Sequence, residues 1–394
     1  MDLPNSHGPC RTIRVLHLVE STLAGVRRHV IDLLNGLNQD YADKVELHLG
    51  YSLRRADENF KENQKVLESL GVKCFECDMT RSINPSVDAR AVMKVVDYIK
   101  RHEIDIVHTH SAKAGYVGRL AAKISGRSKS IYTPNASPFR LSSKYHVLEV
   151  LAGWMLSDAI IAVSSTEREE LISNKICPKQ KIYMINSGIP STAFTCSSAA
   201  RNLGDPTRKF VVGTVGRLSQ QKAPKRFIEI AERTLGKFHN VEFRWIGDGE
   251  LRPEIEQMIQ SKHLTEKVQI TGWLDNVEKA LLELDVFLLS SDYEALSYTP
   301  MEAMRAGLPC VLSNVTGSSD LVKEGETGFI VFPSDIDGYV SSILQLLSDK
   351  ELHKKMGQAG CKRWQEKFHL SSMVRSTAHL YQDLLFTYSD KVAT

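Results

Sequence analysis

The sequence predicts an α/β protein with two Rossmann-like domains that face each other across a cleft, followed by a helical C-terminal tail. The chain has 394 residues, which is more than one hydrophobic core usually organises. Short β-branched segments alternate with helical patterns in two successive series, as βαβ units of a parallel sheet do. Between the series, Ser187–Lys209 is rich in small and polar residues, which is typical of a linker. We therefore predict a first domain at 1–190, a linker at 191–208, a second domain at 209–370, and a helix at 371–394 that crosses back to the first domain.

The first series contains seven apolar segments of strand length. Helical patterns lie between them, for example at Val26–Leu37 and Ala89–Arg101. The predicted strands are Ile13–Val19, Val45–Tyr51, Val72–Cys77, Ile104–Thr109, Ser130–Thr133, Ala159–Ser164 and Lys181–Ile185.

The second series repeats this layout. Its helical patterns include Pro224–Leu235 and Glu250–Ser261, and the chain from Asp335 to about Tyr388 is predicted to be wholly helical. The predicted strands are Phe210–Val215, Val241–Ile246, Val268–Thr271, Val286–Leu289, Pro309–Leu312 and Gly328–Val331.

Composition and charge argue against several classes of protein. The net charge of +3 is too small for the strongly basic face of a nucleic-acid-binding protein. Seven cysteines are scattered through a chain whose N-terminus does not resemble a signal peptide, so a reducing cytoplasm is the simplest expectation. Cys74 and Cys77 lie within a predicted strand and are expected to be structural. The longest apolar stretch, Val147–Val163, is interrupted by charge and glycine, and it predicts a buried helix followed by a strand.

Two glutamates, Glu294 and Glu302, are the most informative feature of the second domain. They follow the strand at Val286–Leu289, one in a loop and one in the first turns of the next helix. Open α/β sheets bind ligands at this edge, and carboxylates accept hydrogen bonds from the hydroxyls of a sugar or ribose. The alternative is a solvated loop and helix start, where Glu is common.

Two cations follow the first strand of the second domain. Arg217 and Lys222 stand between a glycine turn at Gly216 and a helix that begins near Pro224. A guanidinium and an ammonium beside a helix N-terminus could share the oxygens of a diphosphate. The alternative is a pair of surface cations.

Polar residues also follow strands of the first domain. Gly25 precedes a helix and would let the backbone approach a ligand, but its loop lacks the glycine pattern of nicotinamide or flavin sites. Alternation places His108 and His110 on the same side of a strand, where they could bind a metal or be satisfied by the backbone. The pair Asp335 and Asp337 resembles a metal-nucleotide motif, but helix capping explains it better.

Together these segments resemble the large family of retaining glycosyltransferases that includes bacterial polysaccharide and glycogen-synthase-like enzymes, glycosyltransferase family four, which has the GT-B fold. The resemblance covers nearly the whole chain, and the order and spacing of its motifs carry it. These motifs are His108-Thr-His110-Ser-x-Lys-Ala-Gly115, Gly216-Arg217-Leu-Ser-x-x-Lys222, Ile246-Gly-Asp-Gly249, Glu294-x7-Glu302, Glu302-Ala-Met-x-Ala-Gly-Leu-Pro309 and Glu324-Gly-Glu-Thr-Gly-Phe329.

The resemblance implies a role for each candidate residue. Arg217 and Lys222 would hold the donor diphosphate, and Glu302 the ribose hydroxyls. Glu294 would contact the transferred sugar and His110 would lie near that sugar and the attacking hydroxyl. The remaining binding residues would be Gly25 at a phosphate and Trp273 and Leu274 at the nucleobase.

The implied reaction moves a sugar from a nucleotide-diphosphate sugar to a hydroxyl with retained anomeric configuration, without a metal or other cofactor. A UDP-sugar is preferred as donor and GDP-mannose is next. Two departures from the family stand out. The loop Ser21-Thr-Leu-Ala-Gly25 has fewer glycines than in many relatives, which weakens the expected phosphate contact. In addition, Asn135 occupies a position where many relatives have histidine, and Ser297-Tyr-Thr-Pro300 is unusual between the glutamates.

The acceptor is expected on the first domain, and relatives suggest a lipid-linked saccharide in surface polysaccharide biosynthesis. The segment Lys113–Lys129 is basic and amphipathic, so it could contact the anionic inner membrane, which would make the protein cytoplasmic and peripheral at the membrane. The alternative is a solvated helix face. Three other functions fit the fold: a nucleotide-sugar epimerase, a pyridoxal-dependent phosphorylase, and a non-catalytic scaffold subunit that binds nucleotide sugar.

Overall fold

The computed structural model describes residues 11–135, 143–196, 208–274 and 276–386. The described chain forms two compact units. The first unit ends at Gly188 and also includes the C-terminal helix from Leu370, whereas the second unit runs from Ile189 to His369. The predicted linker falls at the start of the second unit, and its residues 197–207 lie outside the described part.

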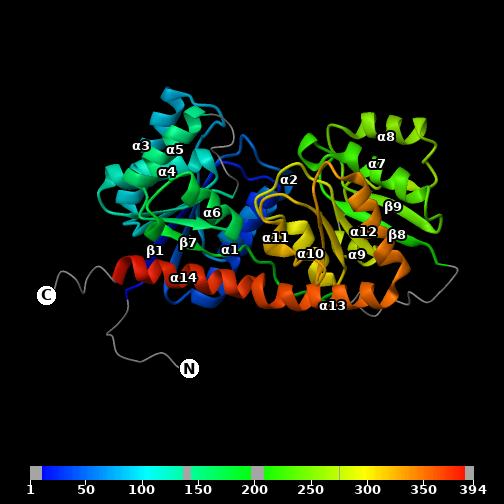
Figure 1. Cartoon of the computed structure of the whole chain (residues 1–394). Coiled ribbons are helices and arrows are strands. Elements are labelled where there is room, and N and C mark those ends of the chain that lie inside the picture. Colours follow the sequence, from blue (N-terminus) through cyan, green and yellow to red (C-terminus); the bar gives the residue numbers. More distant parts are fainter. Residues whose placement is uncertain (1–10, 136–142, 197–207, 275, 387–394) are drawn as a thin grey trace, which may run out of the picture. The chain divides into compact units, whose positions relative to one another are not determined.

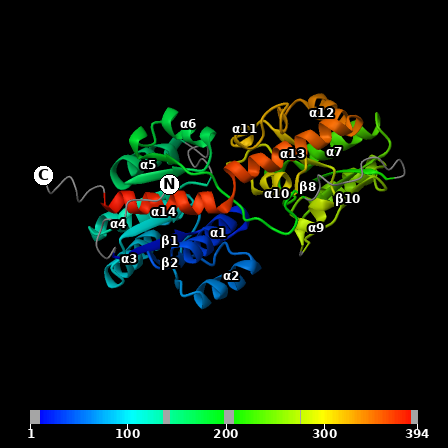
Figure 2. The same cartoon turned by 90° about the horizontal axis from the view of Figure 1, so that it is seen from below.

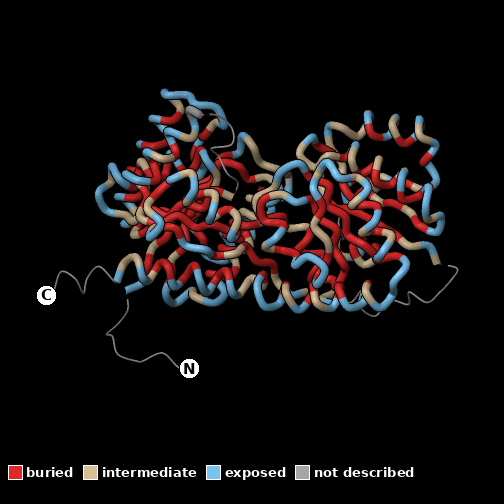
Figure 3. The backbone as a smooth tube through the Cα atoms, viewed as in Figure 1, coloured by how far each residue is buried: buried red, intermediate tan, exposed pale blue. Residues whose placement is uncertain are grey.

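The first unit contains a seven-stranded parallel sheet with the order β3-β2-β1-β4-β5-β6-β7. The inner strands are buried along almost their whole length, as continuous apolar strands covered on both faces should be (Figure 3). The strands are β1 Ile13–Val19, β2 Val45–Tyr51, β3 Lys73–Glu76, β4 Ile106–His110, β5 Lys129–Thr133, β6 Ala159–Ala162 and β7 Ile182–Met184. The helices are α1 Ala24–Tyr41, α2 Glu58–Ser69, α3 Pro85–Arg101, α4 Ala112–Ser125, α5 Ser143–Leu156, α6 Ser165–Ser173 and α14 Leu370–Phe386 (Figure 1), with a short 3-10 helix η2 at Lys179–Lys181.

The second unit contains a six-stranded parallel sheet with the order β10-β9-β8-β11-β12-β13. Its strands are β8 Phe210–Val215, β9 Val241–Ile246, β10 Val268–Ile270, β11 Val286–Leu289, β12 Cys310–Ser313 and β13 Gly328–Val331. Its helices are α7 Pro224–Leu235, α8 Arg252–Ser261, α9 Val277–Leu282, α10 Tyr298–Ala306, α11 Ser318–Leu321, α12 Ile336–Ser348 and α13 Lys350–Lys367, with a short 3-10 helix η4 at Gln220–Lys222.

The predicted architecture of two Rossmann-like parallel sheets and a helical C-terminal region is confirmed. The expected capping role of Asp335 is also confirmed, because its carboxylate accepts from Gly338 N–H at 2.9 Å at the start of α12. The prediction of a buried helix within Val147–Val163 is wrong for α5, which exposes one whole face.

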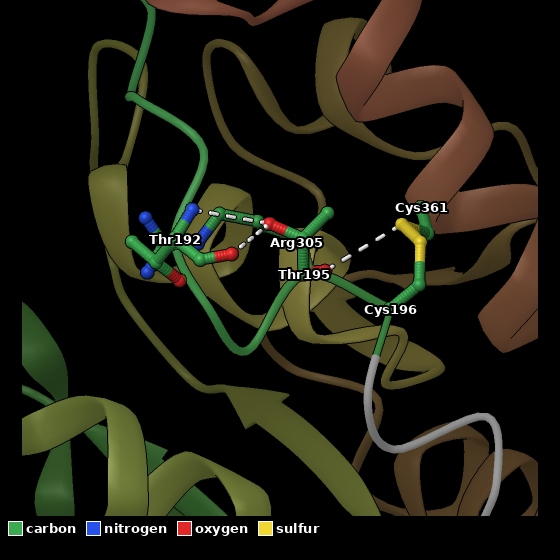
Figure 4. Close-up of a disulfide and its surroundings, with 5 residues drawn as sticks. All are labelled: Thr192, Thr195, Cys196, Arg305 and Cys361. Atoms are coloured by element: carbon green, nitrogen blue, oxygen red, sulfur yellow. Dashed lines mark hydrogen bonds between the residues drawn. A yellow bond between two sulfur atoms is a disulfide. The ribbon is translucent and has the colours of Figure 1, made fainter.

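A disulfide joins Cys196 to Cys361 of α13 across 165 positions of sequence (Figure 4). Next to it, Cys196 N–H donates to Arg305 O at 2.7 Å, and the buried Arg305 guanidinium donates to Pro190 O at 2.9 Å. The expectation of reduced cysteines is wrong for this pair, which meets only in the folded unit, whereas Cys74, Cys77, Cys177 and Cys310 are free thiols. Cys74 is not paired, and burial raises the pKa of its thiol to about 12, as expected for a structural cysteine.

Helix α14 packs along α1 of the first unit (Figure 2). Gly36 makes this close approach possible, because a Cβ atom there would lie 2.4 Å from Val374 Cγ2. A glycine in the middle of a helix is normally unfavourable by about 0.5–1 kcal/mol relative to alanine, so here contact with α14 outweighs helix propensity.

A hydrogen-bonded chain of side chains fastens α14 to the sheet. The hydroxyl of Tyr381 lies 3.2 Å from His17 Nε2 and 2.7 Å from His108 Nδ1. His17 Nδ1 lies 3.1 Å from His110 Nε2, and His108 Nε2 lies 2.8 Å from Thr133 Oγ1. Because the tyrosine hydroxyl has one proton, it donates to one imidazole and accepts from the other, so the protons of the chain point in one direction.

We predict that Gly36→Ala destabilises the protein by about 1–3 kcal/mol, because the new methyl group overpacks the α1–α14 contact. Urea unfolding would measure the loss. The double variant Gly36→Ala, Val374→Ala should recover part of it, since the clash partner is removed. A stabilising Gly36→Ala variant would contradict the close approach.

We also predict that the first unit loses stability as the pH falls below about 6.5. Burial lowers the pKa of His17 to about 3 and that of His29 to about 4, so between these values and the unfolded value near 6.5 the unfolded chain binds more protons. Each such histidine lowers the free energy of unfolding by up to about 1.4 kcal/mol per pH unit. Urea midpoints at pH 7.5 and 5.5 would measure the slope, and His17→Gln should reduce it. An equal slope in both proteins would rule out this contribution.

Candidate active site

Each sheet reverses its strand order at one place, between β1 and β4 in the first unit and between β8 and β11 in the second. Parallel α/β sheets bind ligands at the carboxyl ends of the two strands that flank such a reversal. In the second unit, β8 leads to Arg217 and Lys222, and β11 leads to Glu294. In the first unit, β1 leads to Gly25, and β4 ends at His110.

The structure brings Lys222 and Glu294 into direct contact. Lys222 Nζ lies 2.6 Å from Glu294 Oε1, and this oxygen also accepts from Ser291 Oγ at 2.7 Å. Glu294 Oε2 has no hydrogen-bond partner among the described residues. The glutamate is therefore held by one oxygen, and its other oxygen can accept from a ligand hydroxyl.

Backbone contacts fix these two loops to each other. Asp292 N–H donates to Gln221 O at 2.8 Å, and the Gln221 amide donates to Tyr293 O at 3.0 Å. Ser290 Oγ donates to Lys222 O at 3.0 Å. The ion pair of Lys222 with Glu294 is thus held between two loops that are hydrogen-bonded to each other.

Arg217 is exposed, and within the described part of the chain its guanidinium has no ion-pair or hydrogen-bond partner. Two glycines let the loop after β9 pass beneath it. A Cβ at Gly249 would lie 2.8 Å from Arg217 Cγ, and one at Gly247 would lie 2.2 Å from Gly216 O. The glycines therefore allow a tight turn that presents an unpaired cation beside Lys222.

Glu302 is buried on α10, one helix turn beyond the start. No side chain caps the N-terminus of α10, so its first amides are not satisfied by the usual cap. Gly317 packs closely under the loop that carries Glu294, since a Cβ there would lie 2.0 Å from Ala295 O. Glu294 and Glu302 thus belong to one tightly packed loop and helix, as the sequence predicted.

Trp273 and Leu274 are both exposed at the end of β10. A backbone bridge between Gly247 and Gly272 brings them beside the glycine loop that supports Arg217. An exposed indole next to this loop is free to stack on a flat ligand group.

Gly25 is the second residue of α1 and is exposed. The start of this helix already carries a carboxylate, because Asp57 Oδ2 accepts from Ala24 N–H at 3.3 Å and pairs with Arg27 Nε at 2.9 Å. The sequence analysis missed Asp57. Its position just before α2 indicates only that it caps that helix, not that it also contacts the start of α1. A phosphate at Gly25 would have to compete with this carboxylate.

His110 is fully buried at the end of β4. Its Nδ1 is buried and makes no hydrogen bond, whereas its Nε2 contacts His17 Nδ1 and forms one end of the hydrogen-bonded chain that passes through Tyr381. The backbone turns sharply after it, since Ser111 has φ 73° and Asn135, just after β5, has φ 57°. Strained non-glycine residues of this kind concentrate at functional sites.

Three imidazoles, those of His17, His108 and His110, have nitrogen atoms within 4.8 Å of one another. The sequence indicated two of them, and His17 joins from β1 because its strand pairs with β4 at His108. Burial lowers the pKa of all three, so they are neutral at pH 7. Their nitrogens are largely taken up by bonds to each other, Tyr381 and Thr133, which makes the cluster a structural network.

The prediction that the segment Lys113–Lys129 forms a basic surface is wrong for two of its cations. Lys113 is buried and pairs with Asp88 at 2.8 Å, and Arg119 is fully buried and pairs with Glu149 at 2.8 Å. These cations hold α3 and α5 against α4 and are not available to a membrane.

Comparison with known proteins agrees with this geometry. Residues 23–192 match the model described as glycosyltransferase family 4, and residues 198–363 match the model described as glycosyl transferases group 1. The UDP-Gal:alpha-D-GlcNAc-diphosphoundecaprenol alpha-1,3-galactosyltransferase of Escherichia coli is 30% identical over 296 residues, which are 71% of this chain and 76% of that protein. The capsular polysaccharide biosynthesis glycosyltransferase CapM of Staphylococcus aureus is 26% identical over 334 residues, 78% of this chain and 84% of that protein.

Solved structures share the fold at lower identity. Alr3699/HepE of Anabaena, in complex with UDP, is 22% identical with a TM-score of 0.77, over 94% of this chain and 100% of that one. The lipopolysaccharide outer core galactosyltransferase WaaB, in its apo form, is 18% identical with a TM-score of 0.74, over 95% of this chain and 100% of that one. On its family matches and its identity to the Escherichia coli enzyme, the chain belongs to glycosyltransferase family four and is a glycosyltransferase of the GT-B fold.

Proposed function

We propose that the protein transfers a sugar from a nucleotide-diphosphate sugar, a UDP-sugar before GDP-mannose, to a hydroxyl of a lipid-linked saccharide, with retention and without a metal. The observation that carries the proposal is the contact of Lys222 with Glu294 beside the unpaired Arg217, at the strand reversal of the second unit. This arrangement offers two cations and a carboxylate oxygen to a ligand that has both phosphates and hydroxyls.

The donor would lie on the second unit. Arg217 and Lys222 would bind the diphosphate, Glu302 the ribose, and Trp273 with Leu274 the base. Names of relatives favour uridine, because the Escherichia coli enzyme is named for UDP-Gal and HepE was solved with UDP and glucose.

The chemistry would depend on stabilising the leaving diphosphate. Negative charge develops on it as the bond to the sugar breaks, and fixed cations in a dry site stabilise that charge. The leaving phosphate can take the proton of the acceptor hydroxyl, which attacks from the same face of the sugar. Glu294 would orient the sugar through Oε2, so the two-carboxylate scheme of retaining glycosidases is not needed.

The acceptor would lie on the first unit, near His110 and the loop of Gly25. The bare Nδ1 of His110 suits a hydrogen bond with a hydroxyl of the sugar or acceptor. A lipid-linked saccharide would place the enzyme in surface polysaccharide biosynthesis, in the cytoplasm and peripheral to the inner membrane. Two names support this part of the proposal. The Escherichia coli relative is named for a diphosphoundecaprenol-linked sugar, and CapM is named for capsular polysaccharide biosynthesis.

Two other functions remain open to test. A nucleotide-sugar epimerase would release a free epimerised sugar in the absence of acceptor. A scaffold subunit would bind donor without any turnover.

We predict that alanine at Arg217, Lys222 or Glu294 preserves the fold and lowers turnover of the UDP-sugar by roughly 10²–10³-fold, because each removes a contact to charge or sugar in the transition state. Steady-state release of UDP would measure the effect, and the thermal midpoint would check the fold. Lys225→Ala is the matched control, since this lysine pairs with Glu254 at 2.5 Å on the surface of α7 and α8. Turnover at the wild-type level in any of the three variants would remove that residue from the site.

We further predict that UDP stabilises the protein more than GDP or ADP in a thermal-shift experiment with EDTA present. A ligand at a hundred times its Kd stabilises by about 2.7 kcal/mol. A larger shift with GDP would reassign the donor, and a shift that needs magnesium would contradict metal independence. No shift with any nucleotide would reject the proposed donor site.

A further inference from the structure

Helix α5 of the first unit is apolar on nearly all sides. Among Tyr145–Leu156 the only charged residue is Glu149, and it is buried against Arg119 at 2.8 Å. Helices without a polar face are normally buried in a core or a membrane. Among the residues that the structure describes, one side of α5 is buried and the other is exposed.

Within Tyr145–Leu156, the exposed side of α5 consists of large apolar residues. Positions 147, 148, 151, 154 and 155 fall within one arc of about 120° at the helical 100° per residue. We call them the α5 face: Val147, Leu148, Leu151, Trp154 and Met155, with exposed fractions of 55%, 40%, 52%, 54% and 66%. Contiguous apolar surface of this kind marks an interaction site, whereas single exposed apolar residues are common.

Neighbouring elements add cations and more apolar surface. Helix α4 contacts α5, and its outward residues Tyr116, Lys123 and Ile124 are exposed. At the end of α5, the Trp154 indole N–H donates to the backbone oxygen of Lys175 at 3.0 Å, and that lysine is exposed. Neither the outer side of α4 nor the α5 face carries a carboxylate.

We propose that the α5 face lies in the interface of an anionic lipid bilayer. An apolar face with aromatic residues and flanking lysines fits the boundary between headgroups and acyl chains. The helix has 14 residues, about 21 Å, which is shorter than a membrane core of about 30 Å. No helix among the described residues is both long and apolar enough to cross a bilayer, so α5 lies along the surface.

Charge decides between a bilayer and a second copy of the chain. In a symmetric dimer the same surface faces itself, and neither the α5 face nor the outer side of α4 offers a carboxylate to pair with Lys123 or Lys175 of the other copy. Anionic headgroups complement these lysines instead. The carboxylate just beyond α5, Asp158, is neutralised by Lys129 at 3.4 Å and does not change this balance.

This inference rests on the proposed membrane-held acceptor and names the surface that meets the membrane. It moves the contact from the segment Lys113–Lys129, whose Lys113 and Arg119 are buried, to α5. The buried pair of Arg119 and Glu149 keeps α5 against α4 and leaves its apolar face outward.

Vesicle flotation tests the proposal with the full chain. Wild-type protein should float with vesicles of phosphatidylethanolamine and phosphatidylglycerol, and at least tenfold less with phosphatidylcholine alone. Leu151→Glu with Met155→Glu should lower binding to the anionic vesicles at least tenfold. Val66→Glu with Leu70→Glu is the matched control, because these residues are as exposed on the same unit, at the end of α2. Lipids brominated near the headgroup should quench Trp154, and Trp154→Phe should lose that quenching.

Equal binding by the α5 variant and wild type, or no wild-type binding to anionic vesicles, would overturn the proposal. A wild-type dimer that the α5 variant converts to monomers, without vesicle binding, would assign the face to a second copy instead. The UDP thermal shift should be the same in the variant and wild type, since α5 belongs to the first unit. A missing UDP shift with intact vesicle binding would reject the donor proposal alone.

Discussion

In each parallel sheet the strand order reverses once. The segments that leave the two strands at this reversal must diverge to opposite faces of the sheet. That divergence leaves polar backbone and side chains at the carboxyl ends of the strands without regular partners. In the first unit the reversal at β1 and β4 places His110 beside the loop that starts α1, and the register pairs Val19 with His110. In the second unit the reversal at β8 and β11 places Lys222 beside Glu294. The candidate site in each unit follows from this one constraint of topology.

Half of the non-glycine residues with positive φ in the described part of the chain lie at the carboxyl edges of the two sheets. Ala24, Ser111, Asn135 and Ala223 all have positive φ, and each follows a strand at its carboxyl end. None is glycine, so each conformation costs of order 1–3 kcal/mol and persists because the surrounding structure imposes it. The rest of each sheet, with its buried β-branched strands and packed helices, supplies that stability. Rigid loops in turn hold side chains such as Lys222 in one arrangement before a ligand arrives.

Much of the fold was predictable because it depends on local pattern. The bounds of β1, β2, β8 and α7 agree with those expected from apolar periodicity. The positions of the motif residues of the second unit after the ends of strands were also predictable, because loops and strand ends are read directly from the sequence. Their binding roles stay predictions. Contacts between distant elements were not predictable. In the sequence, Arg119 and Lys113 resemble solvated cations. They are buried because each pairs with an acid from another helix, Glu149 of α5 and Asp88 of α3 respectively.

The same limit applies to the histidines and cysteines. His17 and Tyr381 are 364 positions apart, and no local pattern indicates that α14 brings a hydroxyl to β1. Cys196 and Cys361 likewise meet only because the second unit folds between them. Asp57 was missed because its local role as a helix cap conceals its contact with Ala24 of another helix.

The charge balance of the second unit indicates where an anionic ligand would bind. Lys222 and Glu294 cancel each other in the free protein, and Arg217 is left as the unpaired cation. A diphosphate would therefore be drawn first to Arg217, whose planar fork matches two phosphate oxygens. Lys222 could then share its three donors between phosphate and Glu294 without leaving the carboxylate uncompensated. Because Ser291 also donates to Glu294 Oε1, the carboxylate would keep its orientation when Oε2 accepts from a sugar hydroxyl. In the proposed site, one ion pair would thus link recognition of the phosphate to placement of the sugar.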